Sequence, residues 1–206
     1  MLQKEDVMPQ TLFNQILDET LDLPAGIDPH KKQEIYAYSF ELARPDHRHG
    51  YRVLVNEGNI ADSIYFLLKG TCRFYYYSRV HGQELVPFLM LSPCLLAEGR
   101  SFHKMLPARF SIAVFEPSIV YKLNKGAITS ITEKYPEVSP GIRLMMKQQN
   151  YDFKTWKREL FTKTAGIRYK HLCDTRPLLV SVAKKKDIAG HLGIRDTSLS
   201  RLMRTL

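Results

Sequence analysis

The feature that most constrains the fold is the segment at residues 185–206, which reads KKDIAGHLGIRDTSLSRLMRTL. Its apolar residues are spaced as two short helices that cross at a steep angle require. A small residue, Ala189, falls at the expected crossing, and Gly193 can adopt the left-handed conformation that ends the first helix and turns the chain. The segment predicts a helix-turn-helix with a core of Ile188, Ala189, Leu192, Gly193, Ile194, Leu199 and Leu202.

The second predicted helix leaves its polar side chains on the face opposite this core. In a helix-turn-helix, the amino-terminal part of the second helix lies nearest the base edges of the major groove. The Arg201 guanidinium would suit a guanine, whereas Asp196 could accept from a cytosine amine or cap the helix. The candidate base-reading residues are Asp196, Thr197, Ser198 and Arg201.

The net charge of +9 is unevenly distributed along the chain. Residues 141–206 hold 15 Lys and Arg against 5 Asp and Glu, whereas the preceding residues hold 15 against 16. A basic tail on a neutral body is typical of proteins that bind polyanions, because each cation that meets a phosphate releases counterions. A basic surface without such a role is the alternative that charge leaves open. The predicted phosphate contacts are Lys184, Lys185, Lys186 and Arg204.

Between Gly50 and Asn124 the pattern changes to short runs rich in Val, Ile, Tyr and Phe, interrupted by glycine turns. This pattern predicts an antiparallel barrel or sandwich, with a hairpin that turns at His81-Gly82. Helices are predicted before it at residues 11–21 and 29–42, the second capped by Asp28. Residues 95–111 are expected to form a loop with one helical turn.

A long helix is predicted after the barrel, with Ser139 as its cap and Pro140 in its first turn. Its narrow apolar stripe favours pairing with a second copy of the chain, although the stripe could equally lie against the barrel of its own chain. The stripe comprises Ile142, Met145, Gln149, Phe153, Trp156 and Leu160.

Several other classes of protein are disfavoured. Cys72, Cys94 and Cys173 are widely spaced, so neither a disulfide framework nor a zinc or iron-sulfur site is indicated, and no metal site is predicted. No secretory signal or long apolar run is present, so we expect a cytoplasmic protein without a membrane segment. His47 and His49 lack a third metal ligand at a matching spacing, and no nucleophile and base are recognisable, so no enzymatic activity is expected.

The chain resembles the Crp/Fnr family of bacterial transcription regulators over nearly its whole length. The resemblance is carried by NEGNIADSIYFLLKGTCRFYYY, by the long helix, and by AGIRYKHL with IAGHLGIRDTSLSRLMR. It implies an α+β fold with three parts. These are a cyclic-nucleotide-binding-like antiparallel β-barrel, or jelly roll, at residues 1–136, a dimerisation helix at 137–163, and a helix-turn-helix DNA-binding domain at 164–206.

The same resemblance places an effector pocket at Glu98, Gly99, Arg109 and Ser111. Family members that bind cyclic nucleotides hold the ribose with a Gly-Glu-Leu and the phosphate with an Arg-Ser pair. Here Ala108 falls at the arginine position and Arg109 at the serine position. Neighbouring residues of an extended chain point to opposite faces, so no cofactor is expected and cyclic AMP is disfavoured unless the loop shifts by one residue.

The resemblance implies a homodimer that binds a palindromic promoter site in double-stranded DNA, contacts RNA polymerase, and responds to an unidentified small-molecule effector. Two departures stand out. Arg195 occupies the place of the usual Ser or Thr cap, a task that could pass to Asp196, and no residues follow Leu206 for the usual β-wing, so wing contacts are expected to be missing. The alternative function is a cyclic-nucleotide-binding regulatory module that acts on a protein partner.

Overall fold

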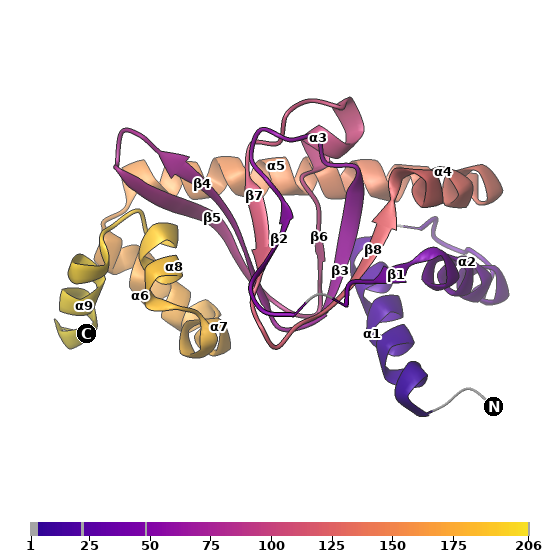
Figure 1. Cartoon of the computed structure of the whole chain (residues 1–206), viewed down its shortest axis with the longest axis horizontal. Helices are drawn as coiled ribbons and strands as arrows, with labels where there is room; N and C mark the ends of the chain where they lie inside the picture. Colours follow the sequence, from indigo (N-terminus) through magenta and orange to yellow (C-terminus); the bar gives the residue numbers. More distant parts are fainter. Residues whose placement is uncertain (1–3, 22, 48, 206) are drawn as a thin grey trace.

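In the computed structural model, residues 4–21, 23–47 and 49–205 are described. A β-roll of two antiparallel four-stranded sheets lies between amino-terminal and carboxy-terminal groups of helices, and one long helix runs along the whole assembly (Figure 1). The sheet orders are β1-β8-β3-β6 and β2-β7-β4-β5. The strands are β1 (Arg44–Pro45), β2 (Arg52–Val55), β3 (Ser63–Lys69), β4 (Thr71–Ser78), β5 (Gln83–Leu91), β6 (Cys94–Leu96), β7 (Ser111–Val114) and β8 (Ile119–Asn124).

The β-rich region predicted between Gly50 and Asn124 is confirmed, and so is its hairpin. Strands β4 and β5 pair in antiparallel register, and Gly82 at their turn has a φ of 60°, a left-handed conformation that glycine adopts without strain. The segment predicted as a loop contains β6 and a short helix, α3 (Gly99–Lys104), whose first turn is capped by the Glu98 carboxylate.

Two helices at the amino terminus cover one end of the roll. Helix α1 (Lys4–Thr20) begins earlier than predicted, whereas α2 (Pro29–Leu42) has the predicted bounds and the predicted cap, since Asp28 Oδ1 accepts from the His30 N–H at 2.9 Å. Phe13 and Ile16 of α1 are fully buried and pack with Phe66 of β3 in a shared core. This core fixes the amino-terminal helices to the sheet β1-β8-β3-β6.

The long helix is α5 (Ser139–Thr162), which follows α4 (Lys125–Lys134) and a 3-10 turn at Pro136–Val138. The predicted cap was wrong, because Ser139 is already helical and Val138 occupies the cap position without a side-chain hydrogen bond. Phe153 and Trp156 of the predicted stripe face the chain's own roll and carboxy-terminal helices. The side chains of Ile142 and Met145 lie outside the described residues.

The carboxy-terminal helices form a separate core, to which the roll contributes two buried residues. Tyr169, Leu172, Leu179 and the helix-turn-helix core pack together with Val86 and Leu89 of β5. Among the described residues, no helix has the length and apolar character needed to cross a bilayer. The helices of this group are α6 (Ala165–Thr175), α7 (Pro177–Val182), α8 (Lys185–His191) and α9 (Asp196–Thr205).

Candidate nucleic-acid interface

The turn between α8 and α9 has the predicted geometry. Helix α8 ends at His191, Gly193 takes a φ of +65°, and α9 begins at Asp196. A Cβ atom added to Gly193 would also lie 3.0 Å from Leu160 Cδ2 of α5, so the position is restricted by space as well as by conformation. The turn therefore fixes α9 relative to both α8 and the long helix.

Four of the seven predicted core residues are buried, and the other three are half-buried. Ile188, Ala189, Leu192 and Leu199 are each at most 3% exposed, while Leu202 is half-buried and approaches Gly166 of α6. Because Ala189 is 1% exposed inside the carboxy-terminal core, a larger side chain there would have to displace its neighbours. Packing at these core positions therefore contributes to the orientation of α9.

The outer face of α9 is polar and accessible. Asp196, Thr197, Arg201 and Arg204 are exposed, and Ser198 is half-buried. Arg195, not Asp196, precedes the helix, and its carbonyl accepts from the Ser198 and Leu199 N–H groups. Asp196 therefore lies in the first turn, where its charge offsets the helix dipole.

The three lysines at the start of α8 are exposed, but each has a neighbour. Lys185 Nζ donates to Ser200 Oγ at 3.4 Å, and Lys184 Nζ lies 4.7 Å from the centre of the Phe115 ring. Lys186 Nζ lies 3.3 Å from Glu84 Oε2 on β5. A phosphate approaching Lys186 would therefore compete with a carboxylate of the roll.

Helix α8 packs directly on the β4–β5 hairpin. A Cβ atom built on Gly190 would come within 2.8 Å of Val86 Cγ2 and 2.9 Å of the Glu84 carbonyl oxygen. Only glycine allows so close an approach, because backbone atoms cannot give way as a flexible side chain can. This contact joins the sensor-like roll to the helix-turn-helix within one chain.

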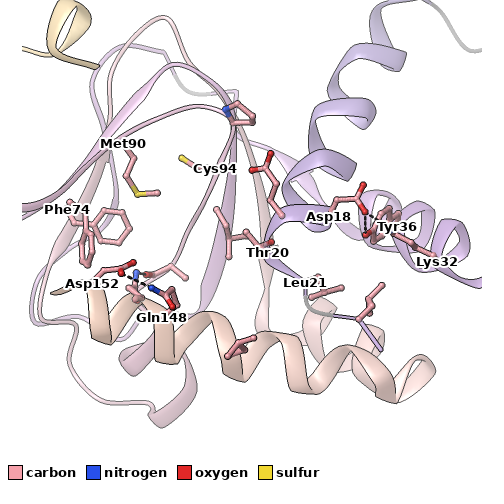
Figure 2. A pocket seen from close by; sticks show the side chains of 18 of the residues that line it. Asp18, Thr20, Leu21, Lys32, Tyr36, Phe74, Met90, Cys94, Gln148 and Asp152 are labelled. Carbon is pink, nitrogen blue, oxygen red and sulfur yellow. Dashed lines mark hydrogen bonds and ion pairs between the residues drawn. The ribbon is translucent and has the colours of Figure 1, made fainter. Parts of the chain in front are cut away.

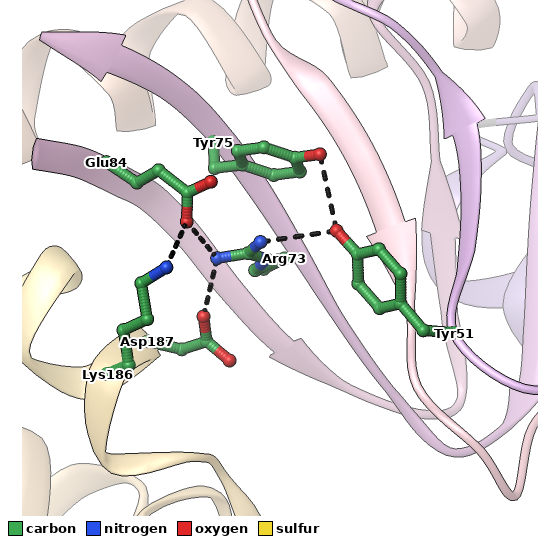
Figure 3. A network of polar contacts seen from close by, with 6 residues as sticks. All are labelled: Tyr51, Arg73, Tyr75, Glu84, Lys186 and Asp187. Atoms are coloured by element: carbon green, nitrogen blue, oxygen red, sulfur yellow. Dashed lines mark hydrogen bonds and ion pairs between the residues drawn. The ribbon is translucent and has the colours of Figure 1, made fainter.

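A buried polar network reinforces the contact (Figure 3). The Arg73 guanidinium of β4 donates to Asp187 Oδ1 of α8 at 2.7 Å and to Glu84 Oε2 at 2.8 Å. It also donates to the Tyr51 hydroxyl at 3.2 Å and lies 4.0 Å from the centre of the Tyr75 ring. Arg73 is 8% exposed and Asp187 is 2% exposed, so solvent screens this ion pair little.

The charges of this network are mutually dependent. Burial raises the pKa of Asp187, even though Arg73 and Lys184 act in the opposite direction. Burial also raises the pKa of Glu84 in isolation, but Arg73 and Lys186 more than compensate and hold the pKa of that carboxyl below its usual value. Removing the Arg73 charge would therefore leave two neighbouring carboxylates without their shared partner.

His191 forms a second link between α8 and the roll. Its Nδ1 lies 2.8 Å from the Val86 carbonyl oxygen, and its own carbonyl accepts from Trp156 Nε1 at 2.9 Å. Burial lowers the pKa of His191 from 6.5 to about 4, although the Val86 carbonyl acts in the opposite direction. The imidazole is therefore neutral at physiological pH and donates to Val86 through its Nδ1 hydrogen.

Arg168 of α6 joins the carboxy-terminal ends of two helices. Its guanidinium donates to the carbonyl oxygens of Glu159 and Lys163 near the end of α5, and to that of Leu192 after α8. Carbonyl groups at a helix end lack partners within the helix, and a cation satisfies them well. Arg168 thus fixes the turn of the helix-turn-helix to the end of the long helix.

Sequence reasoning missed the residues that hold α8 against the roll. Arg73 and Glu84 alternate with apolar residues along predicted strands, where a charged residue normally faces solvent. Asp187 and Gly190 gave no signal of their own, because a helix of seven residues tolerates either at an outer position. Only the pairing of a hairpin with a helix more than a hundred residues away gives them a role.

The predicted effector residues divide into two groups. Arg109 Nε donates to Glu98 Oε1 at 3.1 Å, and Gly99 N–H donates to Gln149 Oε1 of α5 at 3.2 Å. Ser111 lies apart on β7, where its hydroxyl accepts from the Glu57 N–H at 2.9 Å. Glu98, Gly99 and Arg109 therefore meet at α5, whereas Ser111 supports a turn.

The Glu98 carboxylate is engaged within the protein. It is 1% exposed, accepts from both the Ser101 N–H and Arg109, and Arg109 also donates to Asn150 Oδ1 of α5 at 3.1 Å. Ala108 is buried, with its backbone bonded to the turn at residues 56–59. Arg109, the cation that contacts Glu98, is therefore already bonded to Glu98 and Asn150.

A separate cavity of about 930 Å³ lies between α1, α2, the strands β4 to β6 and α5 (Figure 2). Its apolar walls include Phe74, Phe88 and Met90 from the roll. The polar part includes carboxylates of α1 and α5 together with the amides of Gln148 and Gln149, and Lys32 is paired with Asp18. The cavity is large enough for a small ligand and is distinct from the Glu98–Arg109 pair.

Comparisons with known proteins agree on the fold. No family model matches the sequence, and no curated protein matches it closely. FixK2 from Bradyrhizobium japonicum superposes with a TM-score of 0.68 at 16% identity over 80% of this chain and 84% of that chain. The c-di-GMP-responsive global regulator CLP of Xanthomonas campestris gives a TM-score of 0.67 at 11% identity over 84% and 90%.

A third similar structure is a transcriptional regulator assigned to the Crp/Fnr family, from Eubacterium rectale. It superposes with a TM-score of 0.66 at 13% identity over 86% of each chain. The three superpositions each cover at least 80% of this chain. The chain has the fold of the Crp/Fnr transcription regulators, as the sequence resemblance predicted.

Proposed function

We propose that the chain is a non-enzymatic, sequence-specific DNA-binding transcription regulator. The observation that carries this proposal is α9, which presents Thr197, Arg201 and Arg204 outward while Leu199 is fully buried beneath them. An exposed cationic helix held by a fixed turn is the geometry with which a recognition helix enters the major groove. Arg201 would read a guanine, and Lys184, Lys185 and Lys186 would bind phosphates.

The proposal includes a homodimer on a palindromic promoter site, with contacts to RNA polymerase, in the cytoplasm. Because Phe153 and Trp156 of the predicted stripe pack within the chain, we expect a second copy to use another side of the helix. Leu144 and Tyr151 are exposed and seven residues apart, so they share one side of α5. Tyr151→Asp should shift the mass measured by light scattering from dimer toward monomer, and an unchanged dimer would contradict this assignment.

The contact between α8 and the hairpin supports a route from sensor to DNA. A dimer must place its recognition helices about 34 Å apart to engage both half-sites. Because α8 is fixed to β5, any movement of the hairpin moves α9 as well. An effector that shifts the roll between two states would thereby change DNA affinity, provided that it binds the two states unequally.

Anionic effectors are not favoured at the Glu98 site. A cyclic phosphate requires a cation directed toward it, and Arg109 already pairs with Glu98 and Asn150. Cyclic AMP would have to displace both contacts. We propose that the effector belongs to a different chemical class.

Selection of bound sequences from random duplexes tests the function directly. The purified chain, with and without cell extract, should enrich a site with two-fold symmetry. No enrichment in either condition would contradict the regulator and favour a module that regulates a protein partner. Because phosphate contacts alone give no sequence preference, weak uniform retention would also count against the proposal.

A further inference from the structure

The β4–β5 hairpin has two covered faces with different neighbours. Phe74 and Phe88 lie on one face, where they belong to the core of the roll and line the large cavity. Arg73 and Leu89 alternate to the other face, where Arg73 bonds Asp187 and Leu89 packs with the carboxy-terminal helices. In the antiparallel register the two phenylalanines are opposite each other, and so are Arg73 and Leu89. One layer of backbone therefore separates the cavity from the contact that holds α8.

The strand side of the cavity is apolar. Figure 2 shows Phe74, Met90 and Cys94 on this side, and Gln148 of α5 on the other. The rings of Phe74 and Phe88 meet edge to face, with their centres 5.3 Å apart. A volume of about 930 Å³ is in the range of sites for small organic molecules. Because aromatic and thioether side chains pack well against rings, this wall favours a ligand with an aromatic body.

The rim of the cavity is acidic. Asp18, Glu19 and Asp152 contribute exposed carboxylates, and Lys32 is the one basic side chain of the described lining. Lys32 already pairs with Asp18. The other two carboxylates accept from neutral glutamine amides, at 3.0 and 2.8 Å, so these contacts do not compensate their charge. Such a rim lowers the free energy of a nearby cation and raises that of an anion.

We propose that the cavity binds an organic cation with an apolar body, of the class of protonated aromatic amines, and that this ligand is the effector. The aromatic body fills the space against Phe74 and Met90, and the ammonium group stays at the rim, on the side of Asp152. Because only the body is buried, the ligand avoids the cost of desolvating its charge. The role as effector rests on the proposed DNA-binding function, whereas the binding of the cation does not.

The hairpin gives the ligand a route to α8. Phe74 and Arg73 are adjacent in β4, so a ligand that displaces the Phe74 ring also moves the backbone that carries the ion pair with Asp187. A ligand shifts an equilibrium only if it binds the two states unequally. The docked and released states of α8 should differ at this wall of the cavity, and ligand binding should therefore alter the docking of α8.

The test uses the full-length chain and three probes with the same phenyl ring and four-carbon chain, namely phenylbutylamine, phenylbutanol and phenylbutyrate. Calorimetric titration should give the tightest binding for the amine, about tenfold tighter than for the anionic butyrate, with the neutral alcohol between them. Equal affinity for the amine and the butyrate, or no binding of the amine, would overturn the proposal.

A single substitution at the rim tests the role of its charge. Asp152→Asn keeps an oxygen acceptor at an exposed position, so the chain should fold, and the affinity for phenylbutylamine should fall about threefold while that for phenylbutanol stays the same. Asp174→Asn makes the same change at an exposed position of α6 and is the matched control. Equal amine affinities in the two variants would contradict the charge contact.

The place of binding can be tested in the unaltered chain. Saturating phenylbutylamine should slow the alkylation of Cys94, which lines the cavity, and leave that of Cys173 in α6 unchanged. An unchanged rate at Cys94 would refute the site.

Amide hydrogen exchange tests the route to α8. Exchange in α8 should change in the saturated amine complex but not with phenylbutyrate at the same concentration. Unchanged exchange with the amine would reject the effector role. None of these measurements involves DNA, so a failed selection from random duplexes would reject the regulator function and leave the binding site intact.

Discussion

The two helices of the helix-turn-helix are buried in different ways. Helix α9 buries only the side of Leu199 and leaves Thr197, Arg201 and Arg204 exposed. Helix α8 is enclosed on two sides, by α9 and by the β4–β5 hairpin, through Asp187, Gly190 and His191. For the proposed DNA-binding function, this difference would make α8 the helix that positions the motif and α9 the helix that reads the bases. Changes in α8 should therefore alter stability and coupling, while changes in α9 should alter base preference.

The largest expected effect comes from the centre of the contact between α8 and the roll. Arg73→Met should lower the free energy of unfolding by about 3–5 kcal/mol, because it leaves the buried Asp187 without its partner. Chemical denaturation measures this change. Arg79→Met makes the same substitution at an exposed position of the same hairpin, and should stay within about 0.5 kcal/mol of the unaltered chain. Equal effects would show that α8 does not depend on the network.

The second effect is a pH dependence that originates in His191. Its pKa is about 4 in the folded chain and 6.5 when exposed, so its neutral form is favoured by folding. The neutral imidazole contributes its full stabilisation above pH 6.5, and this is lost as the pH falls toward 4, by roughly 1 kcal/mol at pH 5.5 and about 3 kcal/mol below pH 4. Glu159, Arg168 and Arg176 also face the ring.

His191→Gln should remove this contribution from the pH profile of thermal unfolding. His171→Gln, in an exposed position of α6, is the control and should leave the slope between pH 4 and 6.5 unchanged. A profile that stays the same in His191→Gln would mean that the imidazole is not neutralised by docking. It would also weaken the distinction between a positioning helix and a reading helix.

The third effect concerns α9 itself. Arg201→Ala should cost about 1–3 kcal/mol of binding free energy at one base position and relax the preference there, with little effect on folding. Binding to a panel of duplexes with single base changes measures this loss. Lys125→Ala, at the start of α4, should not alter the preference. A loss from Arg201→Ala that is uniform across all duplexes would contradict a base-reading role.

The smallest expected effect is on DNA affinity and comes from Lys185, at the start of α8. Lys185→Ala should weaken binding to all sequences alike and reduce the slope of log affinity against log salt by about one unit, as expected for one lost phosphate contact. Titrations at several salt concentrations provide this slope. A changed base preference would instead place Lys185 among the reading residues. This alternative needs testing because Lys185 contacts Ser200 of α9, the helix proposed to read the bases.

Local sequence patterns determined a large part of this protein. The glycine turn at Gly193, the small residue at Ala189 and the alternation along the strands predicted the helix-turn-helix and the roll, because backbone conformation and burial depend on near neighbours. The bounds of α2 and its Asp28 cap followed in the same way. Such features need only residues a few positions apart.

Only the tertiary structure determined which elements pack against each face of a helix or strand. The apolar stripe of α5 was compatible with a partner chain or with its own roll, and the positions of Phe110 and His191 show that two of its residues, Phe153 and Trp156, pack within the chain. The pairing of Arg73 with Asp187 depends on residues from a distant strand and helix. Periodicity places a residue on a face of its own element, but the neighbour of that face is set by how the elements pack.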